Sequence, residues 1–484
     1  MSPEATIQAA LIVPFVGALL IALSGQFPNL RETITLITAS TLFVLVISLY
    51  PQAISGSKPL VVIGEMLPGL KIAFSIEPLG LLFAMIASFL WIINSLYSIG
   101  YMRANNEKNQ TRFYVCFALA LACTIAIAFA DNMITLFVFY EALTIITYPL
   151  VTHAGTDKAK QGGRIYLGIL LATSIGFLFI AIVWTWLIAG TLDFSPGGIL
   201  EGKASTMTIG ILLALYMFGI GKAALMPIHR WLPAAMVAPT PVSALLHAVA
   251  VVKAGVFTVV KVVIYVFGFD FLSTMGTTSW LLYVSGFTIL AASILAIRQD
   301  NLKRRLAYST ISQLSYVVMA TAILAPLSIL GAGLHIAAHA FGKITLFFAA
   351  GSIYTVTHKT EVSQLNGIGR HMPWTMGAFS IGALSMIGVP PTAGFISKWY
   401  ILHGAFENDQ LLAVVVVVLS TLLNAGYFLP IIYAAFFKKG KDTNSVDCGE
   451  APAAIVIAIS ITAAATILTF FFPGLFLELA QKLI

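Results

Sequence analysis

Charged residues are scarce in this chain of 484 residues. Asp, Glu, Lys and Arg make up only 9% of it, against about 25% in an average soluble domain. Hydrophobic residues make up 59%, and apolar runs of roughly 20 residues recur, each long enough to cross the core of a bilayer. These solid runs lack the alternation of a transmembrane β-barrel. The sequence therefore excludes a soluble protein and predicts an all-α, polytopic membrane protein.

Cysteine and metal-binding motifs are also scarce. Cys116 and Cys123 share one expected helix and lie about 10 Å apart along it, too far for a disulfide, and Cys448 is the third cysteine. No Cys or His spacing typical of a metal site occurs, so we expect neither a metal nor a cofactor. The first eight residues contain no basic residue, so the first apolar run lacks the positive region of a signal peptide and should remain a membrane helix.

The hydropathy pattern predicts fourteen membrane-spanning helices. Their expected spans are residues 5–24, 32–50, 78–100, 113–130, 132–152, 165–190, 207–226, 240–265, 277–297, 304–324, 327–355, 374–404, 410–437 and 451–476. The connections are short and form no soluble domain, so any redox or ATP-driven chemistry would have to come from partner subunits.

Basic residues in the connections predict the orientation of the chain. The connections after even-numbered helices contain only Lys58, Lys71 and Lys203. Those after odd-numbered helices contain seventeen basic residues: Arg31, Arg103, Lys108, Arg112, Lys158, Lys160, Arg164, Arg230, Arg298, Lys303, Arg304, Arg305, Lys359, Arg370, Lys438, Lys439 and Lys441. The positive-inside rule places them in the cytoplasm and both termini outside. Because the net charge of +7 is scattered over short loops, we expect no nucleic-acid partner.

Two apolar spans are interrupted by Gly and Pro near a lysine. Helix 7 contains Gly219, Lys222 and Pro227, and helix 12 contains the stretch from Gly388 to Lys398. The two helices are five apart, so they cross the membrane in opposite senses. This pattern is typical of inverted repeats whose broken helices form a site near the midplane.

Eight ionisable residues lie inside the expected spans, where a charge costs about 2.5–3.5 kcal/mol on insertion scales. They are Glu141, Lys222, His247, Lys253, His335, His339, Lys343 and Lys398. Ionisable residues at this depth usually pair with one another and mark an ion or proton path. The sequence therefore indicates transport rather than soluble chemistry.

Glu141 and Lys222 form the first expected pair. Glu141 lies in the middle of helix 5 without a flanking charge, so it must be paired or protonated. Lys222 is its natural partner, because Pro227 removes a helical hydrogen bond and should loosen the turn around Lys222. The alternatives are an ion pair that only pins two helices and a lysine that extends to a helix end.

Helices 8 and 11 supply further titratable groups. His247 and Lys253 are six residues apart and face different sides of helix 8, whereas Lys261 is interpreted as a lysine that snorkels from its outer end. On helix 11, a second group of titratable residues lies on one face of the helix over about 12 Å: His335, His339 and Lys343. Such a line of titratable groups suits a proton relay. Without a nearby carboxylate, these histidines make a weak zinc site.

Lys398 on helix 12 ends the series, and helix 10 could add polar groups. If helices 5, 7, 8, 11 and 12 pack side by side, a polar axis runs across the protein in the membrane plane. Helix 10 could contribute hydroxyl and water contacts to this axis through Tyr308, Ser309, Ser312 and Gln313. Ordinary hydrogen bonding between helices is an equal alternative for these residues.

The run Met226–Ala248 resembles the signature of antiporter-like subunits, which occur in Mrp-type multi-subunit Na⁺/H⁺ antiporters, respiratory complex I and membrane-bound hydrogenases. The stretches Phe139–Glu141, Leu302–Gln313 and Gly394–Lys398 look like further hallmarks of this family. The run Met386–Phe395 looks most like the D subunit of the Mrp type. The resemblance covers nearly the whole chain, and the combination of these stretches is highly specific.

The resemblance implies fourteen helices with inverted repeats over helices 4–8 and 9–13. The expected units are residues 1–112, 113–265, 277–437 and 451–484. By motif, Glu141 and Lys222 match the glutamate–lysine pair of the family, Lys253 its central lysine and Lys398 its terminal lysine, where some members have Glu. The location implied is the cytoplasmic membrane of a prokaryote.

Three functions follow as hypotheses. The first is a proton-translocating subunit of a cation/proton antiporter with other membrane subunits as partners. Its Na⁺ would cross elsewhere, because Glu141 is the one clear acidic residue at depth and hard cations need several oxygen ligands. The second is a proton-pumping membrane subunit of a redox complex, and nothing in the chain separates it from the first. The third is a structural anchor that conducts nothing. An enzymatic activity is expected only as part of a redox complex.

Overall fold

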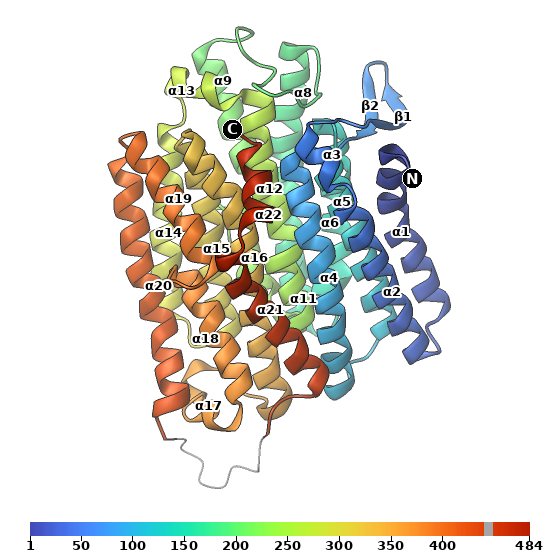
Figure 1. Cartoon of the computed structure of the whole chain (residues 1–484), viewed down its shortest axis with the longest axis vertical. Coiled ribbons are helices and arrows are strands. Elements are labelled where there is room, and N and C mark those ends of the chain that lie inside the picture. Colours follow the sequence, from blue (N-terminus) through green and yellow to red (C-terminus); the bar gives the residue numbers. More distant parts are fainter. Residues whose placement is uncertain (440–448) are drawn as a thin grey trace.

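The computed structural model describes residues 1–439 and 449–484, so Lys441 and Cys448 lie outside the described residues. Long helices pack side by side into one bundle (Figure 1). Both termini lie at the end of the bundle that carries the two short strands, β1 (Val61–Leu67) and β2 (Leu70–Phe74), here called the hairpin end. Helix α17 (Ile368–His371) marks the opposite end.

Eleven helical segments of the described chain are long and apolar enough to cross a membrane. Seven are single helices: α1 (Pro3–Leu23), α4 (Pro78–Ala104), α5 (Gln110–Phe129), α6 (Met133–Val151), α14 (Ser279–Arg298), α16 (Pro326–Thr357) and α20 (Leu411–Phe437). An eighth, α21 (Ala453–Phe471), is followed by α22 (Gly474–Gln481). The other three are composite: α2 (Pro28–Ile47) with α3 (Tyr50–Ser55), α7 (Asp157–Thr173) with α8 (Phe179–Ala189), and α11 (Thr240–Ala244) with α12 (Val251–Val262).

The remaining three expected crossings are broken or polar. Helix α9 (Thr206–Gly219) is short, α15 (Leu302–Ala322) is rich in hydroxyl groups, and one crossing is split into α18 (Pro373–Ile387) and α19 (Ala393–Glu407). Small helices α10 (Trp231–Ala234) and α13 (Phe269–Met275) occupy connections. The prediction of an all-α polytopic membrane protein is therefore confirmed. The division into inverted repeats stays a prediction.

The breaks expected in helices 7 and 12 are both present. Helix α9 ends at Gly219, and the chain continues through the 3₁₀ turn Gly221–Ala223, so Lys222 lies in the break itself and not near the end of a helix reaching residue 226. Helix α18 ends before Gly388, whose φ of +91° is a conformation that glycine adopts easily. Each break thus exposes backbone groups inside the bundle.

Single π-helical turns interrupt two other crossings. The turn Ser174–Leu178 joins α7 to α8, and Leu245–Val249 joins α11 to α12. π-Helical turns are frequent at functional sites, and the second contains His247.

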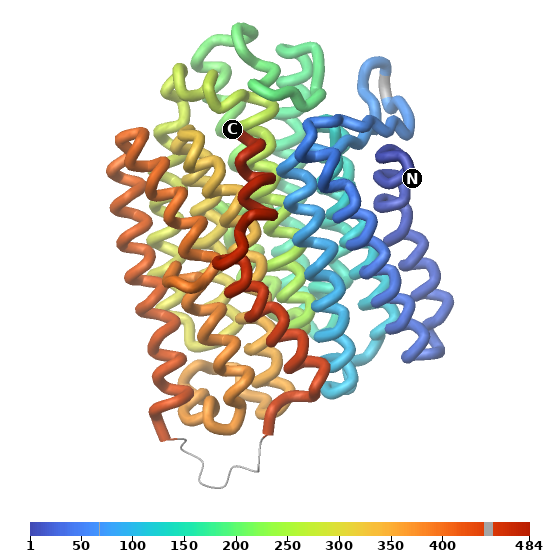
Figure 2. The backbone as a smooth tube through the Cα atoms, in the orientation of Figure 1, coloured from blue at the N-terminus to red at the C-terminus, as the bar shows by residue number. Residues whose placement is uncertain are grey.

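Two parts of the fold differ from the sequence prediction. The stretch 51–77, expected to be a polar connection, contains the antiparallel hairpin β1–β2, anchored by a hydrogen bond from the Ala73 amide to Thr135 Oγ1 of 3.1 Å. The last span, expected as one helix over 451–476, ends at Phe471 because Pro473 cannot continue it. The chain then bends and continues as α22 along α16 and α4 to the hairpin end (Figure 2).

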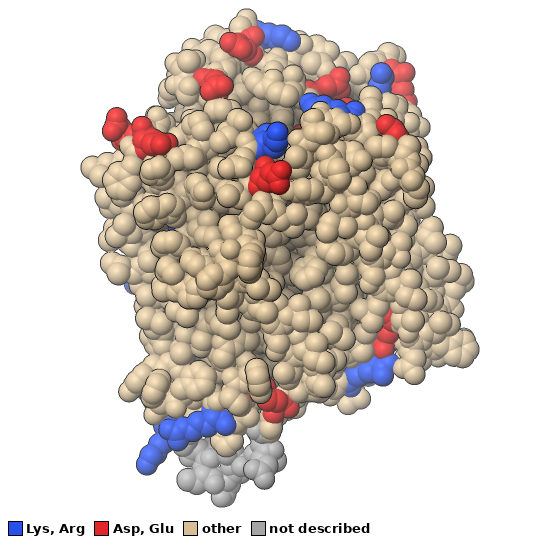
Figure 3. Space-filling model, viewed as in Figure 1, with Lys and Arg blue, Asp and Glu red and all other residues tan. Residues whose placement is uncertain are grey.

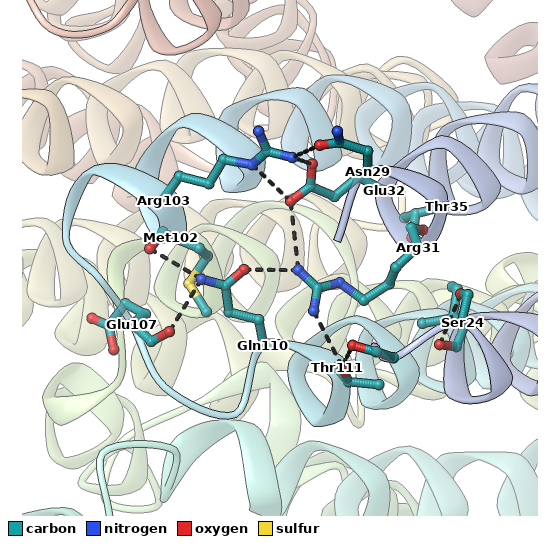
Figure 4. A network of polar contacts seen from close by, with 12 residues as sticks. Ser24, Asn29, Arg31, Glu32, Thr35, Met102, Arg103, Glu107, Gln110 and Thr111 are labelled. Atoms are coloured by element: carbon teal, nitrogen blue, oxygen red, sulfur yellow. Dashed lines mark hydrogen bonds and ion pairs between the residues drawn. The ribbon is translucent and has the colours of Figure 1, made fainter. Parts of the chain in front are cut away.

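The N-terminal helices are fixed by a polar network near the end opposite the hairpin (Figure 4). Glu32 on α2 binds Arg103 on α4, and the Arg103 Nε–Glu32 Oε1 distance is 3.0 Å. Arg31 donates to Gln110 Oε1 at 2.8 Å and to Thr111 Oγ1 at 3.1 Å, both on α5. This network braces α2 against α4 and α5 and contains none of the eight ionisable residues predicted at depth.

Charged side chains gather toward the two ends of the visible face, and a broad belt between them is uncharged (Figure 3). This distribution suits a bundle surrounded by lipid, because a charge in the hydrocarbon region is costly. The charged residues inside the bundle are therefore the exceptions that need an explanation.

Candidate functional site

Helix α16 occupies the centre of the candidate site. It packs against α15, α18, α19 and α21, and the apolar part of the helix is buried inside the bundle. His335, His339 and Lys343 lie on this helix, and each is at most 1% exposed. The single face predicted from their spacing is therefore turned into the protein and away from lipid.

Lys253 on α12 and His339 on α16 are in direct contact. The distance from Lys253 Nζ to His339 Nδ1 is 2.6 Å, and both side chains are buried. An amine and an imidazole at this distance share one proton, since only one of the two nitrogens can donate to the other. This contact joins helices 8 and 11, as the predicted axis requires.

His335 connects α16 to α19. Its Nδ1 atom lies 2.8 Å from Ser397 Oγ, next to Lys398 in the chain. Lys398 Nζ donates to the carbonyl oxygens of Met386 at 2.9 Å and Ile387 at 3.0 Å. These carbonyls end α18 and have no helical partners, so the break in helix 12 supplies acceptors for an ammonium group.

Lys343 points to α15 and α20. Its Nζ atom donates to Ser309 Oγ at 2.7 Å, and the Tyr427 hydroxyl oxygen lies 2.9 Å from the same Ser309 oxygen. Tyr427 also donates to Asn424 Oδ1 at 2.7 Å. Neither α20 residue was among the site residues predicted from the sequence, although Asn424 is a rare polar side chain in an apolar run.

The other helix 10 candidates divide into two groups. Gln313 belongs with the axis, because its Nε2 atom donates to the Met386 carbonyl, at 3.3 Å. Ser312 instead bonds to Ser293 on α14 at 3.0 Å, which is ordinary interhelical bonding. Tyr308 is only partly buried, and its ring centroid lies 6.4 Å from that of His229. Ser309 and Gln313 are therefore the two that contact the axis.

Lys222 is held by Tyr140 rather than by Glu141. Its ammonium donates to the Tyr140 carbonyl and lies 3.2 Å from the centre of the Tyr140 ring, and its backbone amide donates to the Tyr140 hydroxyl at 3.1 Å. Lys222 and Glu141 form no ion pair within 4.0 Å, so the expected partners interact through their charges and not by direct contact. Tyr140 and Glu141 are neighbours in α6 and so point about 100° apart around the helix.

The Glu141 carboxylate is left without a hydrogen bond in the described part of the chain. Both of its oxygens are inaccessible to solvent, and Ser174 in the first π-helical turn faces it. A buried carboxylate without partners is costly when ionised. Glu141 therefore lies at the edge of the predicted polar axis. It acts on Lys222 through its charge and not through a direct contact.

His247 is buried in the second π-helical turn without a polar contact. Neither ring nitrogen has a hydrogen-bond partner among the described residues, and its ring lies 4.8 Å from that of Phe347. The structure thus places it beside α16 but does not link it to Lys253.

Lys261 does not snorkel to the membrane surface. It is 1% exposed, and its ammonium lies 2.5 Å from Glu77 Oε1. The prediction failed because Glu77 precedes α4, in a part of the sequence far from Lys261, and only the tertiary fold brings the two together.

A cavity of about 290 Å³ opens at the end opposite the hairpin, where the sequence analysis had identified only basic loops. Glu107, Lys303 and Thr240 contribute to its lining, and Lys303 Nζ donates to the Ala238 carbonyl at 2.5 Å. Burial raises the pKa of Glu107, and the nearby Lys303 opposes this rise. The cavity reaches the start of the segment that carries His247 and Lys253.

Comparisons with known proteins identify the family of this chain. A family model described as "NADH:quinone oxidoreductase/Mrp antiporter, TM" matches residues 130–424. NADH-quinone oxidoreductase subunit N of Desulforudis audaxviator is 34% identical over 378 residues, covering 77% of this chain and 74% of that protein. Subunit L of Rickettsia bellii is 32% identical over 425 residues and covers 83% of this chain, which spans 63% of that protein.

Solved structures share the fold along the whole chain. A chain of the Mrp complex from Dietzia sp. DQ12-45-1b superposes with a TM-score of 0.89 at 19% identity, covering 100% of this chain and 97% of that one. A chain of the archaeal membrane-bound sulfane sulfur reductase gives 0.86 at 24% identity, covering 98% and 96%. The residues matched by the family model include all eight ionisable residues predicted at depth. This chain therefore belongs to the family of membrane subunits shared by NADH:quinone oxidoreductases and Mrp antiporters.

Proposed function

We propose that this chain is the proton-translocating subunit of a multi-subunit membrane complex. Protons move along a buried row of ionisable side chains formed by Glu141, Lys222, His247, Lys253, His335, His339, Lys343 and Lys398. The contact between Lys253 Nζ and His339 Nδ1 carries this proposal, because it places two titratable nitrogens 2.6 Å apart in the centre of the protein.

The row can move charge because each protonation acts on the next group. Two unit charges 4 Å apart interact by about 4 kcal/mol at an effective dielectric constant of 20. Moving one proton against 100 mV costs about 2.3 kcal/mol. Protonation of Lys253 therefore changes the proton affinity of its neighbours by enough to drive a proton onward, toward Lys398 or toward Lys222.

The first candidate complex is a cation/proton antiporter. The near-complete superposition on a chain of the Mrp complex supports it. In such a complex, Na⁺ would cross through other subunits, because one isolated carboxylate, Glu141, cannot provide the several oxygens that a hard cation needs. The basic loops would face the cytoplasm and both termini the outside.

The second candidate is a proton-pumping subunit of a respiratory redox complex. The 34% identity to an NADH-quinone oxidoreductase subunit favours it. Purification of the native complex through a tag on this chain separates the two candidates. Small membrane subunits alone indicate an antiporter, whereas subunits with iron–sulfur clusters indicate a redox complex.

The test of proton translocation is a set of variants in the assembled complex, reconstituted in proteoliposomes with a pH-sensitive dye. We expect Lys253→Met, Glu141→Ala and Lys222→Ala to lower the rate of proton movement at least tenfold while assembly stays normal. Lys71→Met, an exposed lysine on β2, is the control and should keep the full rate. A wild-type rate in Lys253→Met would refute the proposal, and wild-type rates in all three row variants would leave a structural anchor.

A further inference from the structure

A second buried pair of opposite charges lies at the hairpin end, outside the row. Glu77 precedes the first turn of α4, and Lys261 lies near the end of α12. Their charged atoms are 2.5 Å apart, and the residues are 7% and 1% exposed. Lys261 Nζ also donates to the Ala130 carbonyl at 2.7 Å and lies 4.3 Å from the centre of the Phe194 ring. Glu77, the Ala130 carbonyl and the Phe194 ring therefore surround the Lys261 ammonium group.

Glu77 separates Lys261 from a cavity. This cavity has a volume of about 310 Å³, and both Glu77 and Tyr265 line it, whereas Lys261 does not. Its lining also includes the exposed residues Lys58 and Lys482, so it opens at the hairpin end. The carboxylate thus has a water-accessible space on one side and a buried ammonium on the other.

Helix α12 connects this pair to the row. Lys253 and Lys261 are eight residues apart on α12, which corresponds to about 12 Å along the helix. All residues of α12 are buried, and the Thr258 hydroxyl lies between the two lysines, donating to the Ala254 carbonyl at 2.6 Å. One helix therefore carries a lysine in the row and a lysine behind the cavity.

A purely structural role explains this pair poorly. A buried ion pair usually stabilises a protein no better than apolar side chains of the same size. The other ionisable groups that act on it are Asp131, Tyr265 and Lys58. Asp131 already accepts a hydrogen bond from Ser75 Oγ at 2.6 Å. The pair is thus placed where a proton could pass, not where a cross-link is needed.

We propose that Glu77 and Lys261 form a proton gate between the row and the hairpin end, which rests on the proposed function. In one cycle, the Lys261 ammonium transfers a proton to the Glu77 carboxylate, leaving a neutral pair. The Glu77 carboxyl then loses its proton to water in the cavity. Neutral Lys261 takes a proton that comes from Lys253 through hydroxyl groups and water. One proton enters and one leaves, and the ion pair is restored.

The test compares single and double variants in the reconstituted complex. Glu77→Gln and Lys261→Met each leave one buried charge unpaired, so both should lower transport. The double variant Glu77→Gln/Lys261→Met removes both charges and should assemble normally. A gate predicts at least a tenfold loss of transport in the double variant, whereas a structural pair predicts a normal rate. Lys482→Met changes an exposed lysine in the same cavity and should keep the full rate.

Two further variants separate the possible failures. Lys253→Met tests the row itself: if it transports normally, the proposed function fails. If Lys253→Met is inactive and the double variant is fully active, only the gate is overturned. Should the double variant not assemble, Glu77→Asp decides, because it keeps the charge and lengthens the gap. We expect at least a threefold lower rate for a gate, and an unchanged rate overturns it.

Discussion

At the residue scale, the buried ammonium groups are held mainly by neutral oxygen and nitrogen atoms. Lys222 and Lys398 bind backbone carbonyls, Lys343 binds Ser309, and Lys253 binds His339. A neutral partner accepts a hydrogen bond from an ammonium group without fixing its charge as firmly as a carboxylate would. Each lysine can therefore exist with or without its extra proton, as a relay requires.

Ser309 provides a test of this residue-scale argument. Its hydroxyl oxygen accepts a hydrogen bond from Lys343 and lies 2.9 Å from the Tyr427 hydroxyl oxygen. Ser309→Ala leaves the Lys343 ammonium short of a partner, which costs about 1–3 kcal/mol. We expect a severalfold lower rate of proton movement in proteoliposomes. Ser312→Ala is the matched control, one helical turn away and bonded to α14, and should transport normally. Equal rates in both variants would contradict the argument.

His153 should make stability depend on pH at the end opposite the hairpin. Burial lowers its pKa below the ordinary value of 6.5, and the positive charge of Arg112 adds to this effect. Its Nε2 atom lies 4.0 Å from Glu107 Oε2. Because the folded protein binds fewer protons here than the unfolded chain, the stabilisation is present above pH 6.5 and lost as the pH falls through the lowered pKa.

The variant His153→Gln removes this dependence. Thermal unfolding of the purified complex between pH 5 and pH 8 measures it. As the pH falls below 6.5, we expect the melting temperature of the wild type to decrease more than that of the variant. Parallel curves for the two proteins would show that His153 does not contribute.

At the scale of elements, close packing of α12 on the broken helix positions Lys222. A Cβ atom on Gly255 would lie only 2.4 Å from the Lys222 carbonyl carbon and the Ala223 amide nitrogen. Since backbone atoms cannot move aside, Gly255→Ala must push the two segments apart. Overpacking of this kind typically costs about 1–3 kcal/mol.

Gly255→Ala should therefore lower both the melting temperature and the transport rate of the complex. The matched control is Gly168→Ala on α7, where a Cβ atom would meet no atom within 4 Å. That variant should be as stable as the wild type or slightly more stable, because alanine favours a helix. A Gly255 variant with wild-type stability and transport would show that the contact is not needed.

The elements also show what local sequence predicts well. The shared face of His335, His339 and Lys343 follows from the period of one helix and needs no tertiary information. The breaks at Gly219 and Gly388 follow in the same way from Gly and Pro. Contacts between distant segments do not follow, which is why the partner of Lys261 and the role of Asn424 were missed.

The sequence also could not predict that Lys222 binds Tyr140 rather than Glu141. Adjacent helix positions differ by about 100° in direction, so a shift of one residue changes which group meets the lysine. The sequence placed the right helices together but could not fix their rotation. The hairpin β1–β2 was missed for a different reason: its strands are short and lie in a segment that also contains loop residues.

At the scale of the whole molecule, the bundle surrounds its charged groups with apolar helices. The terminal segments cover two sides: α1 and α2 form one flank, and α21 and α22 pack against α16 (Figure 2). Charged side chains reach the visible surface toward the two ends (Figure 3). The molecule thus separates a polar interior from lipid over most of its height.

The burial of Lys253 on α12 and of Lys343 on α16 has a chemical consequence. Reagents that acylate amines need direct access to a neutral nitrogen, and Lys253 and Lys343 offer none, while Lys58 and Lys71 are freely accessible. The buried lysines therefore should not react with acylating reagents in solution, although they carry the same amino group as the exposed lysines. Their reactivity would become a direct record of any moment at which the bundle opens.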